Sequence, residues 1–194
     1  MLIADALEFL RVRLNAAMPR DAAGASAEDL FVYAGASGEE AVSFPANAVS
    51  LVLVRIEEDP TQRRPDQYLQ VTADGVRKRA EPEIRLNLFI LVVARFPEDY
   101  RLSLHHLSRV VGYFQSHRVF NRENSPDLHE RIPQVMMELV TPSFAEQNEI
   151  WGALRVSYQP SALYRVRMIV FADEEARPVV ATKELIQTVV PLSR

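Results

Sequence analysis

The sequence predicts an α/β (α+β) fold in which a mixed sheet is covered by about three helices. Three segments space their apolar residues as amphipathic helices do, and six to eight segments alternate apolar residues or concentrate β-branched ones, as strands do. The helical segments lie between strand segments, which favours a sheet with helices packed on it. No internal repeat or clear linker interrupts the 194 residues, so we expect a single domain over residues 1–194.

The amino-terminal segment predicts a helix that ends before Pro19. Its apolar residues at helical spacing are Ile3, Leu7, Leu10 and Leu14. The stretch from Arg20 to Pro45 is rich in alanine, glycine, serine and acidic residues. It predicts a loop that holds one short strand, Leu30–Tyr33.

The next part of the chain predicts strands. Val49–Ile56 is dense in β-branched residues and indicates a buried strand. The runs Tyr68–Thr72 and Val76–Ala80 flank Asp74-Gly75, a dipeptide that tolerates the positive φ angles of a tight hairpin turn. Pro82–Phe96 is the longest strand pattern, polar on one face at its start and apolar on both faces later, which is typical of a central strand.

Two further helices are expected in the carboxyl half. The second helix runs from Tyr100 to about His117, and the apolar residues of its stripe are Tyr100, Leu104, Leu107, Val111 and Phe114. The third helix begins after Ser143, because Glu146 stands three positions later, where a capping box requires a glutamate. Along this third helix Phe144, Trp151 and Leu154 are expected to face one way.

Three more strands complete the prediction: Val135–Val140, Tyr164–Phe171 and a terminal strand within Val179–Val190. The terminal run is apolar, and such strands are natural donors to, or edges of, a sheet. We therefore expect it to pair with a partner strand.

Motifs for catalysis, cofactors and metals are missing from the sequence. It has no glycine-rich phosphate loop, no GxSxG and no cysteine. His105 and His106 are adjacent and point about 100° apart on a helix, so they cannot share a metal face. We predict no catalytic, cofactor-binding or metal-binding residue, and the chain is not expected to be an enzyme.

Charge and hydropathy exclude two other classes of partner. The net charge is −4, with 22 basic and 26 acidic residues interspersed, which does not favour nucleic-acid binding. The apolar amino terminus is interrupted by charged residues, so neither a secretory signal nor insertion into a membrane is expected.

Two long runs carry a resemblance to a known family. The first is PEIRLNLFILVVARF from Pro82, followed by a helix ending in VGYFQSHRVF, Val111–Phe120; the second is NEIWGALRVSYQPSALYRVR, Asn148–Arg167. With the opening IADALEFL, their order resembles the amino-terminal domain of the Pvc16-type proteins, which cap extracellular contractile injection systems. The Arg20–Pro45 stretch and the hairpin around Asp74-Gly75 match nothing in that family.

The resemblance implies a fold similar to that of phage tail-terminator proteins. It also implies a hexameric ring at the distal end of the particle, where it stops growth of the inner tube and the sheath. The expected partners are further copies of the chain and the tube and sheath proteins, assembled in the cytoplasm without a cofactor. A phage tail completion or connector protein, or another non-catalytic interaction module, is the alternative, and an enzyme with an unrecognised site is a third.

Two groups of residues follow from these patterns. The aromatic and aliphatic residues expected to form core are Phe114, Trp151, Leu154, Tyr158 and Tyr164. The residues expected to contact a neighbouring subunit, or the last ring of tube or sheath, are Gln159, Pro160, Ser161, Ala162, Arg165 and Arg167. The first four form a rigid turn between a helix and a strand, and the two arginines are cations at the start of an otherwise apolar strand.

Overall fold

The computed structural model describes residues 2–18, 29–36, 42–59, 69–71, 77–79, 84–170 and 177–178. The chain divides into two compact units, of which the first comprises Met1–Gln62 and Glu83–Phe171 and the second comprises Arg63–Pro82 and Ala172–Arg194. The single domain expected over residues 1–194 stays a prediction.

A six-stranded mixed sheet with strand order β1-β4-β7-β10-β9-β8 forms the first unit. Its strands are β1 (Phe31–Tyr33), β4 (Ala48–Glu58), β7 (Ile84–Arg95), β8 (Val119–Asn121), β9 (Gln134–Val140) and β10 (Ser161–Val170). Only β1 and β4 pair in parallel; the other neighbours are antiparallel. The longest predicted strand, β7, lies between β4 and β10, which confirms that it is central.

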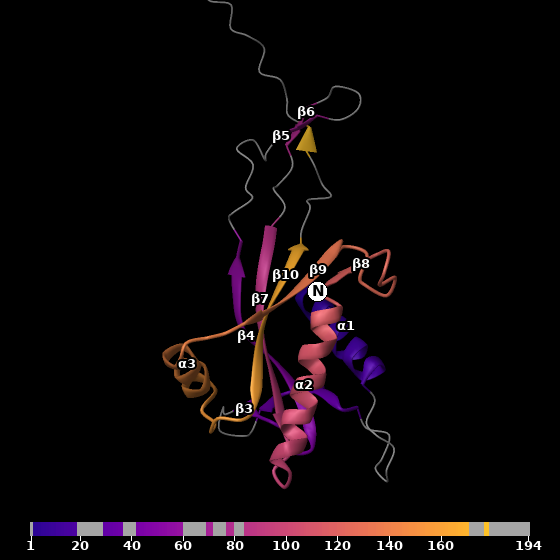
Figure 1. Ribbon diagram of the computed structural model, residues 1–194. Helices are drawn as coiled ribbons and strands as arrows, with labels where there is room; N and C mark the ends of the chain where they lie inside the picture. Colours follow the sequence, from indigo (N-terminus) through magenta and orange to yellow (C-terminus); the bar gives the residue numbers. More distant parts are fainter. Residues whose placement is uncertain are drawn as a thin grey trace, which may run out of the picture. The chain divides into compact units, whose positions relative to one another are not determined.

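Three helices cover the two faces of this sheet: α1 (Leu2–Ala17), α2 (Tyr100–Ser116) and α3 (Phe144–Leu154). Figure 1 shows α1 and α2 on one face and α3 on the other. Each face has its own apolar cluster, since residues of α1 and α2 pack in one cluster and Trp151 of α3 packs in the other. The mixed α+β fold with about three helices is therefore confirmed.

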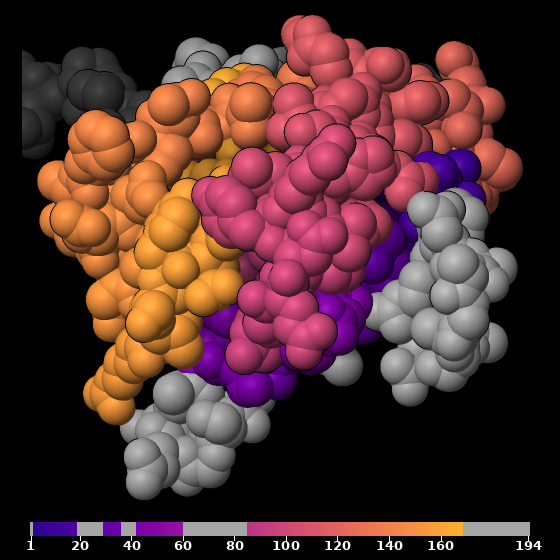
Figure 2. Space-filling model, turned by 60° about the horizontal axis from the view of Figure 1, so that its bottom comes forward, coloured from indigo at the N-terminus to yellow at the C-terminus, as the bar shows by residue number. Residues whose placement is uncertain are grey.

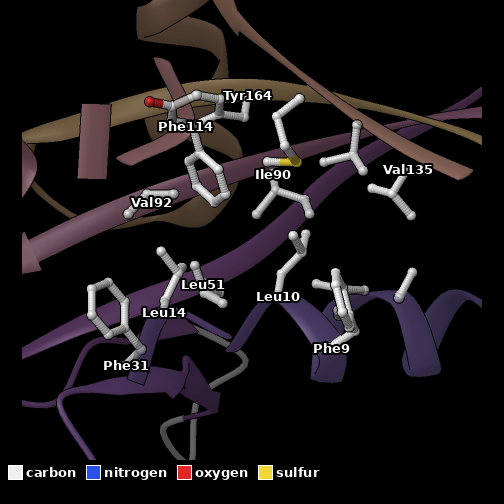
Figure 3. Close-up of a cluster of buried hydrophobic side chains, with 14 of the residues drawn as sticks. Phe9, Leu10, Leu14, Phe31, Leu51, Ile90, Val92, Phe114, Val135 and Tyr164 are labelled. Carbon is white, nitrogen blue, oxygen red and sulfur yellow. The ribbon is translucent and has the colours of Figure 1, made fainter. Parts of the chain in front are cut away.

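The larger cluster lies between the sheet and the helices α1 and α2. Figure 3 shows Leu10 and Leu14 of α1 directed toward Ile90 and Val92 of β7, within a cluster made almost entirely of apolar side chains. Burial of this kind contributes roughly 25 cal/mol per Å² of apolar surface removed from water. The first helix therefore buries the apolar residues Leu7, Leu10 and Leu14, as their spacing in the sequence predicts.

The core-facing side of α2 differs from the predicted stripe. The helix begins after Asp99, whose side chain accepts a hydrogen bond from the Leu102 N–H at 3.0 Å. Its buried residues are Ser103, His106, Val110 and Phe114. Of the predicted stripe only Phe114 is buried; Tyr100, Leu104 and Val111 are 64%, 43% and 36% exposed. The stripe is rotated by about one residue because Ser103 and His106 both contact Phe96.

The third helix begins as its sequence predicts. The Ser143 hydroxyl accepts from the Glu146 N–H at 3.3 Å, and the Glu146 carboxylate accepts from the Ser143 N–H at 2.8 Å, so both halves of the capping box are present. The helix ends at Leu154, and its C-cap residue Arg155 adopts a left-handed conformation with φ of 56°. The expectation that Phe144 faces the same way as Trp151 is wrong, because Phe144 is 87% exposed.

Five short strands lie outside the six-stranded sheet in the part of the chain that the structure describes. β5 (Leu69–Val71) and β6 (Arg77–Arg79) pair antiparallel, which confirms the predicted pairing of these two strands, and β11 (Arg177–Pro178) adds to β6 within the second unit. The predicted turn at Asp74-Gly75 lies outside the described residues. β2 (Gly35–Ala36) and β3 (Val42–Ser43) form a two-stranded pair. The predicted strand Val179–Val190 lies outside the described residues.

An ion-paired cluster joins α1 to β1 at the edge of the sheet. The Glu8 carboxylate accepts from Arg11 at 2.7 and 2.9 Å and from the Tyr33 hydroxyl at 2.9 Å. The hydrogen bonds from Arg11 lower the pKa of Glu8 from 4.5 to about 2. Burial and the Glu8 charge raise the pKa of Tyr33 to about 12. Both groups are therefore locked in one protonation state near neutral pH.

Replacing Glu8 by glutamine should lower the free energy of unfolding by less than about 1 kcal/mol at pH 7, because the Glu8 side chain is 48% exposed and solvent screens such pairs. A carboxylate with a lowered folded-state pKa stabilises the fold above its unfolded pKa and loses that contribution as the pH falls. The difference between Glu8→Gln and the parent chain should therefore disappear between about pH 4.5 and pH 2. Urea unfolding at several pH values measures it, and a difference that persists at pH 2 would contradict the pairing.

Candidate assembly surface

The two arginines predicted to contact a partner lie side by side on β10 and share one carboxylate. Arg165 donates from Nε to Glu138 Oε2 at 2.8 Å and also from Nη2, and Arg167 Nε lies 3.1 Å from Glu138 Oε1. Glu138 stands on β9 directly opposite Arg165. The three side chains are 29–44% exposed, so the cluster is accessible and carries one net positive charge.

The strand register extends this cluster across the sheet. Arg165 pairs with Phe89 on β7, and Phe89 pairs with Arg55 on β4, whose guanidinium lies 5.8 Å from the Phe89 ring centroid. Because residues opposite each other in a sheet share a face, these side chains form one row. The next row contains Arg167, Asn87 and Glu57.

We call this surface the charged face and define it by Arg55, Glu57, Asn87, Phe89, Glu138, Arg165 and Arg167. Its three arginines and two glutamates give a net charge of +1, in a chain whose net charge is −4. Arg55 also pairs with Glu57 along β4. Asn87 is buried, and its side-chain oxygen has no hydrogen-bond partner within the described ranges. The charged face therefore offers guanidinium donors at its surface, while the unpaired oxygen of Asn87 lies beneath it.

The charged face lies on the same side of the sheet as α3. Leu163 precedes Arg165 by two positions on β10, so the two side chains point the same way, and Leu163 packs in the cluster with Trp151. The helix thus covers one part of this face with apolar contacts. Arg165 and Arg167 lie beyond Leu163 on β10, in the part of this face that follows the apolar contacts with α3.

The predicted turn Gln159–Ala162 is only partly a turn. Ser161 and Ala162 are the first residues of β10, paired with Val93 and Val92. Pro160 is buried, and its carbonyl accepts from the Ala94 N–H at 3.0 Å. The sequence predicted that the strand starts at Tyr164, three residues later than it does. The earlier start depends on pairing with β7, a tertiary contact that the local sequence does not report. Gln159 is half-buried and stays the most accessible candidate of this segment that lies outside β10.

The predicted core residues divide between the two sides of the sheet. Phe114 and Tyr164 are buried together with ring centroids 5.0 Å apart, and Trp151 is buried against Phe44 at 5.9 Å, which confirms these three. Leu154 is half-buried at the margin of the cluster around Trp151. The prediction for Tyr158 is wrong: it is 54% exposed, although its ring packs 5.4 Å from Trp151.

Sequence reasoning missed most of the charged face. Glu138 is the only charged residue of β9 and Asn87 is the only amide of β7, so each was visible as a polar residue in an apolar strand. Their positions beside Arg165 and Arg167 depend on the strand order and register, which no local pattern reports.

Neither a metal cluster nor a membrane helix is found in the part of the chain that the structure describes. Its histidines, aspartates and glutamates form no group of three that could hold a metal ion. None of the described helices is long and apolar enough to cross a bilayer. His106 stacks on Phe96 with ring centroids 4.7 Å apart, and His117 stacks on Tyr113 at 4.5 Å, so these two histidines are engaged in packing.

Comparisons with known proteins agree with one another. A family model described as the Pvc16 N-terminal domain matches residues 5–182. The fold is similar to the sheath/tube terminator of an extracellular contractile injection system, PVC, in its extended state, with a TM-score of 0.57 and 19% identity over 100% of this chain and 66% of that one. It is also similar to the tube-terminating cap of the anti-feeding prophage, with a TM-score of 0.56 and 18% identity over 98% of this chain and 63% of that one.

These likenesses show a shared fold. The chain spans slightly less than two thirds of the length of each of these two structures. A comparison with curated proteins finds no match.

Proposed function

The chain belongs to the family of the Pvc16 N-terminal domain, and on that premise we propose that it is the terminator, or cap, of a contractile injection system. The observation that carries the proposal is the family match over residues 5–182 together with the fold shared with two such terminators along nearly the whole chain. As a cap it forms a ring, with six copies as the expected number, at the distal end of the inner tube and sheath. The ring stops further addition of subunits, and assembly takes place in the cytoplasm.

The function of such a protein lies in its surfaces. The charged face supports this because the guanidinium groups of Arg165 and Arg167 are partly exposed on the sheet and are held in place by Glu138. A planar guanidinium that is already oriented loses less side-chain entropy when it binds a carboxylate on a partner. We propose that Arg165 and Arg167 contact acidic groups of a neighbouring subunit or of the last ring of tube or sheath.

Catalysis is not part of this proposal. General acids and bases work best when their pKa lies near the operating pH. In the described residues the largest pKa shifts lead away from neutral pH. The pKa of Glu8 falls to about 2, and the pKa values of Tyr33 and Tyr164 rise to about 12. Hydrogen bonds to Arg11 explain the first of these shifts, and burial is the main cause of the other two.

Gold-labelled antibody against the chain tests the proposal on purified particles. A terminator should be labelled at a single end of each particle and nowhere along its length. Label distributed along the sheath, or particles with no label, would contradict the proposal. Particles from cells that lack the chain serve as the control for non-specific labelling.

A further inference from the structure

One strand of the sheet is longer than the neighbour that covers its outer edge. β8 pairs with β9 only from Gln134 to Met136, and one more hydrogen bond joins the Met137 N–H to the Arg118 carbonyl at 2.8 Å. Backbone groups alternate in direction along a strand, so the next N–H and C=O on this side belong to Leu139. On this outer side none of the described strands pairs with Leu139, while β10 pairs with it on the inner side. The outer edge of β9 is therefore open at Leu139.

A groove of about 550 Å³ lies beside this open edge, between β9 and the second half of α2. We call it the β9 groove. Its lining is mainly apolar and includes Val111, Phe114, Met137, Leu139 and Tyr164. Figure 2 shows this side of the molecule, where the surface is hollowed between the pink atoms of α2 and the orange and yellow atoms of the later segments.

The tyrosine in this groove has an unused hydroxyl. Tyr164 is only 2% exposed, and its oxygen has no hydrogen-bond partner within the described residues. Figure 3 shows the hydroxyl directed away from Ile90 and Val135 of the core. Burial raises the pKa of Tyr164 to about 12, so at neutral pH the group is a proton donor. Buried hydroxyls are normally hydrogen-bonded, so a chain bound in the groove could satisfy this one by supplying an acceptor.

Two exposed apolar side chains line the same groove, and a third stands on the same helix. Leu139 is 54% exposed and Val111 is 36% exposed. Leu104 is 43% exposed and stands two turns before Val111 on the same face of α2. This is the part of the predicted apolar stripe that the fold does not bury. Exposed apolar surface beside a groove is a common feature of sites where another chain binds.

We propose that the β9 groove of one copy binds the carboxyl-terminal segment of a second copy, residues 179–190, as an added strand in line with β8. Its backbone would pair with Leu139, an apolar side chain would enter the groove, and a carbonyl or the Gln187 or Thr188 side chain would accept from the Tyr164 hydroxyl. The inference rests on the proposed function, since a ring gives each copy one groove and one neighbouring segment.

The sequence of this segment matches what the groove requires. Residues 185–190 read LIQTVV, an uncharged run with two adjacent β-branched valines that favours an extended strand. An uncharged apolar strand needs to be covered, because an exposed one promotes aggregation. Twelve extended residues span roughly 40 Å.

Cysteine cross-linking tests the proposal directly, because the sequence contains no cysteine. Chain carrying Leu139→Cys is mixed with chain carrying Val189→Cys and oxidised, since strand pairing brings Cα atoms within the 4.4–6.8 Å that a disulfide spans. We expect a disulfide between the two variants. Val12→Cys replaces Leu139→Cys in the control, because Val12 is similarly exposed, at 46%, but lies on α1.

The yield with Leu139→Cys should exceed the control severalfold. Equal yields would overturn the proposal, and so would a disulfide that forms only within one chain in the double variant Leu139→Cys/Val189→Cys. Because the purified chain is used without tube or sheath, this result does not depend on whether the protein terminates a tube.

A second variant tests the hydroxyl. Tyr164→Phe keeps the ring but removes the donor, so cross-linking at a fixed concentration should weaken by up to about tenfold, the value of one hydrogen bond. Because the oxygen lacks a partner within the described residues, the melting temperature should not fall. Unchanged cross-linking together with a lower melting temperature would show that the hydroxyl serves the fold and would contradict its role in the groove.

Discussion

Trp151→Ala is expected to lower the free energy of unfolding by about 3–5 kcal/mol, the usual cost of truncating a buried aromatic residue to alanine. Trp151 is the only residue of α3 that is fully buried, and it holds the helix on the sheet through Phe44 and the apolar residues of β7 and β10. In a chain of this size the melting temperature should fall by roughly 6–20 °C. Calorimetry or circular dichroism measures the change.

The matched control is Phe144→Ala on the same helix. Phe144 is also aromatic but is 87% exposed, so its replacement should change stability by less than about 0.5 kcal/mol. Equal losses for the two variants would contradict the assignment of Trp151 as the residue that fixes α3.

Reversing both arginines of the charged face is expected to abolish end-capping. In Arg165→Glu/Arg167→Glu the charge of the cluster changes from +1 to −3, so an acidic partner surface would be repelled. The same change places three carboxylates together and removes two partly exposed ion pairs, which contributes a loss of about 1–2 kcal/mol. Defective assembly of this variant alone would therefore not separate binding from folding.

A triple variant separates them. Adding Glu138→Arg restores an opposite charge beside positions 165 and 167, with a net charge of −1 in place of +1. This variant should regain most of the lost free energy of unfolding. It should still be missing from particle ends when they are probed with the gold-labelled antibody. Normal end-labelling by the triple variant would show that the arginines serve only the fold.

Local signals predicted local structure well. The capping box at Ser143 and the antiparallel pairing of the two strands that flank Asp74-Gly75 were both correctly predicted, because each depends on residues only a few positions apart. The α2 stripe was predicted one residue out of phase, since apolar residues cover more of the helix than the sheet buries. Its true inward face includes Ser103, whose hydroxyl accepts from the Phe96 N–H at 3.2 Å.

The candidate site was less predictable. Arg165 and Arg167 were visible as cations in an apolar strand, but their shared partner Glu138 is 27 residues from Arg165 and becomes a neighbour only through the register of β9 and β10. The open edge at Leu139 was not visible either, because β8 was not predicted and its short length decides where the edge begins. Both features follow from strand order, which a single sequence does not encode locally.

The length distribution of assembled particles tests the central claim most directly. Electron microscopy would compare particles from cells with the chain, without it, and with the chain restored from a plasmid. A terminator predicts a narrow distribution when the chain is present, and tubes or sheaths of irregular length when it is absent. Particles of the same uniform length in all three preparations would contradict the account.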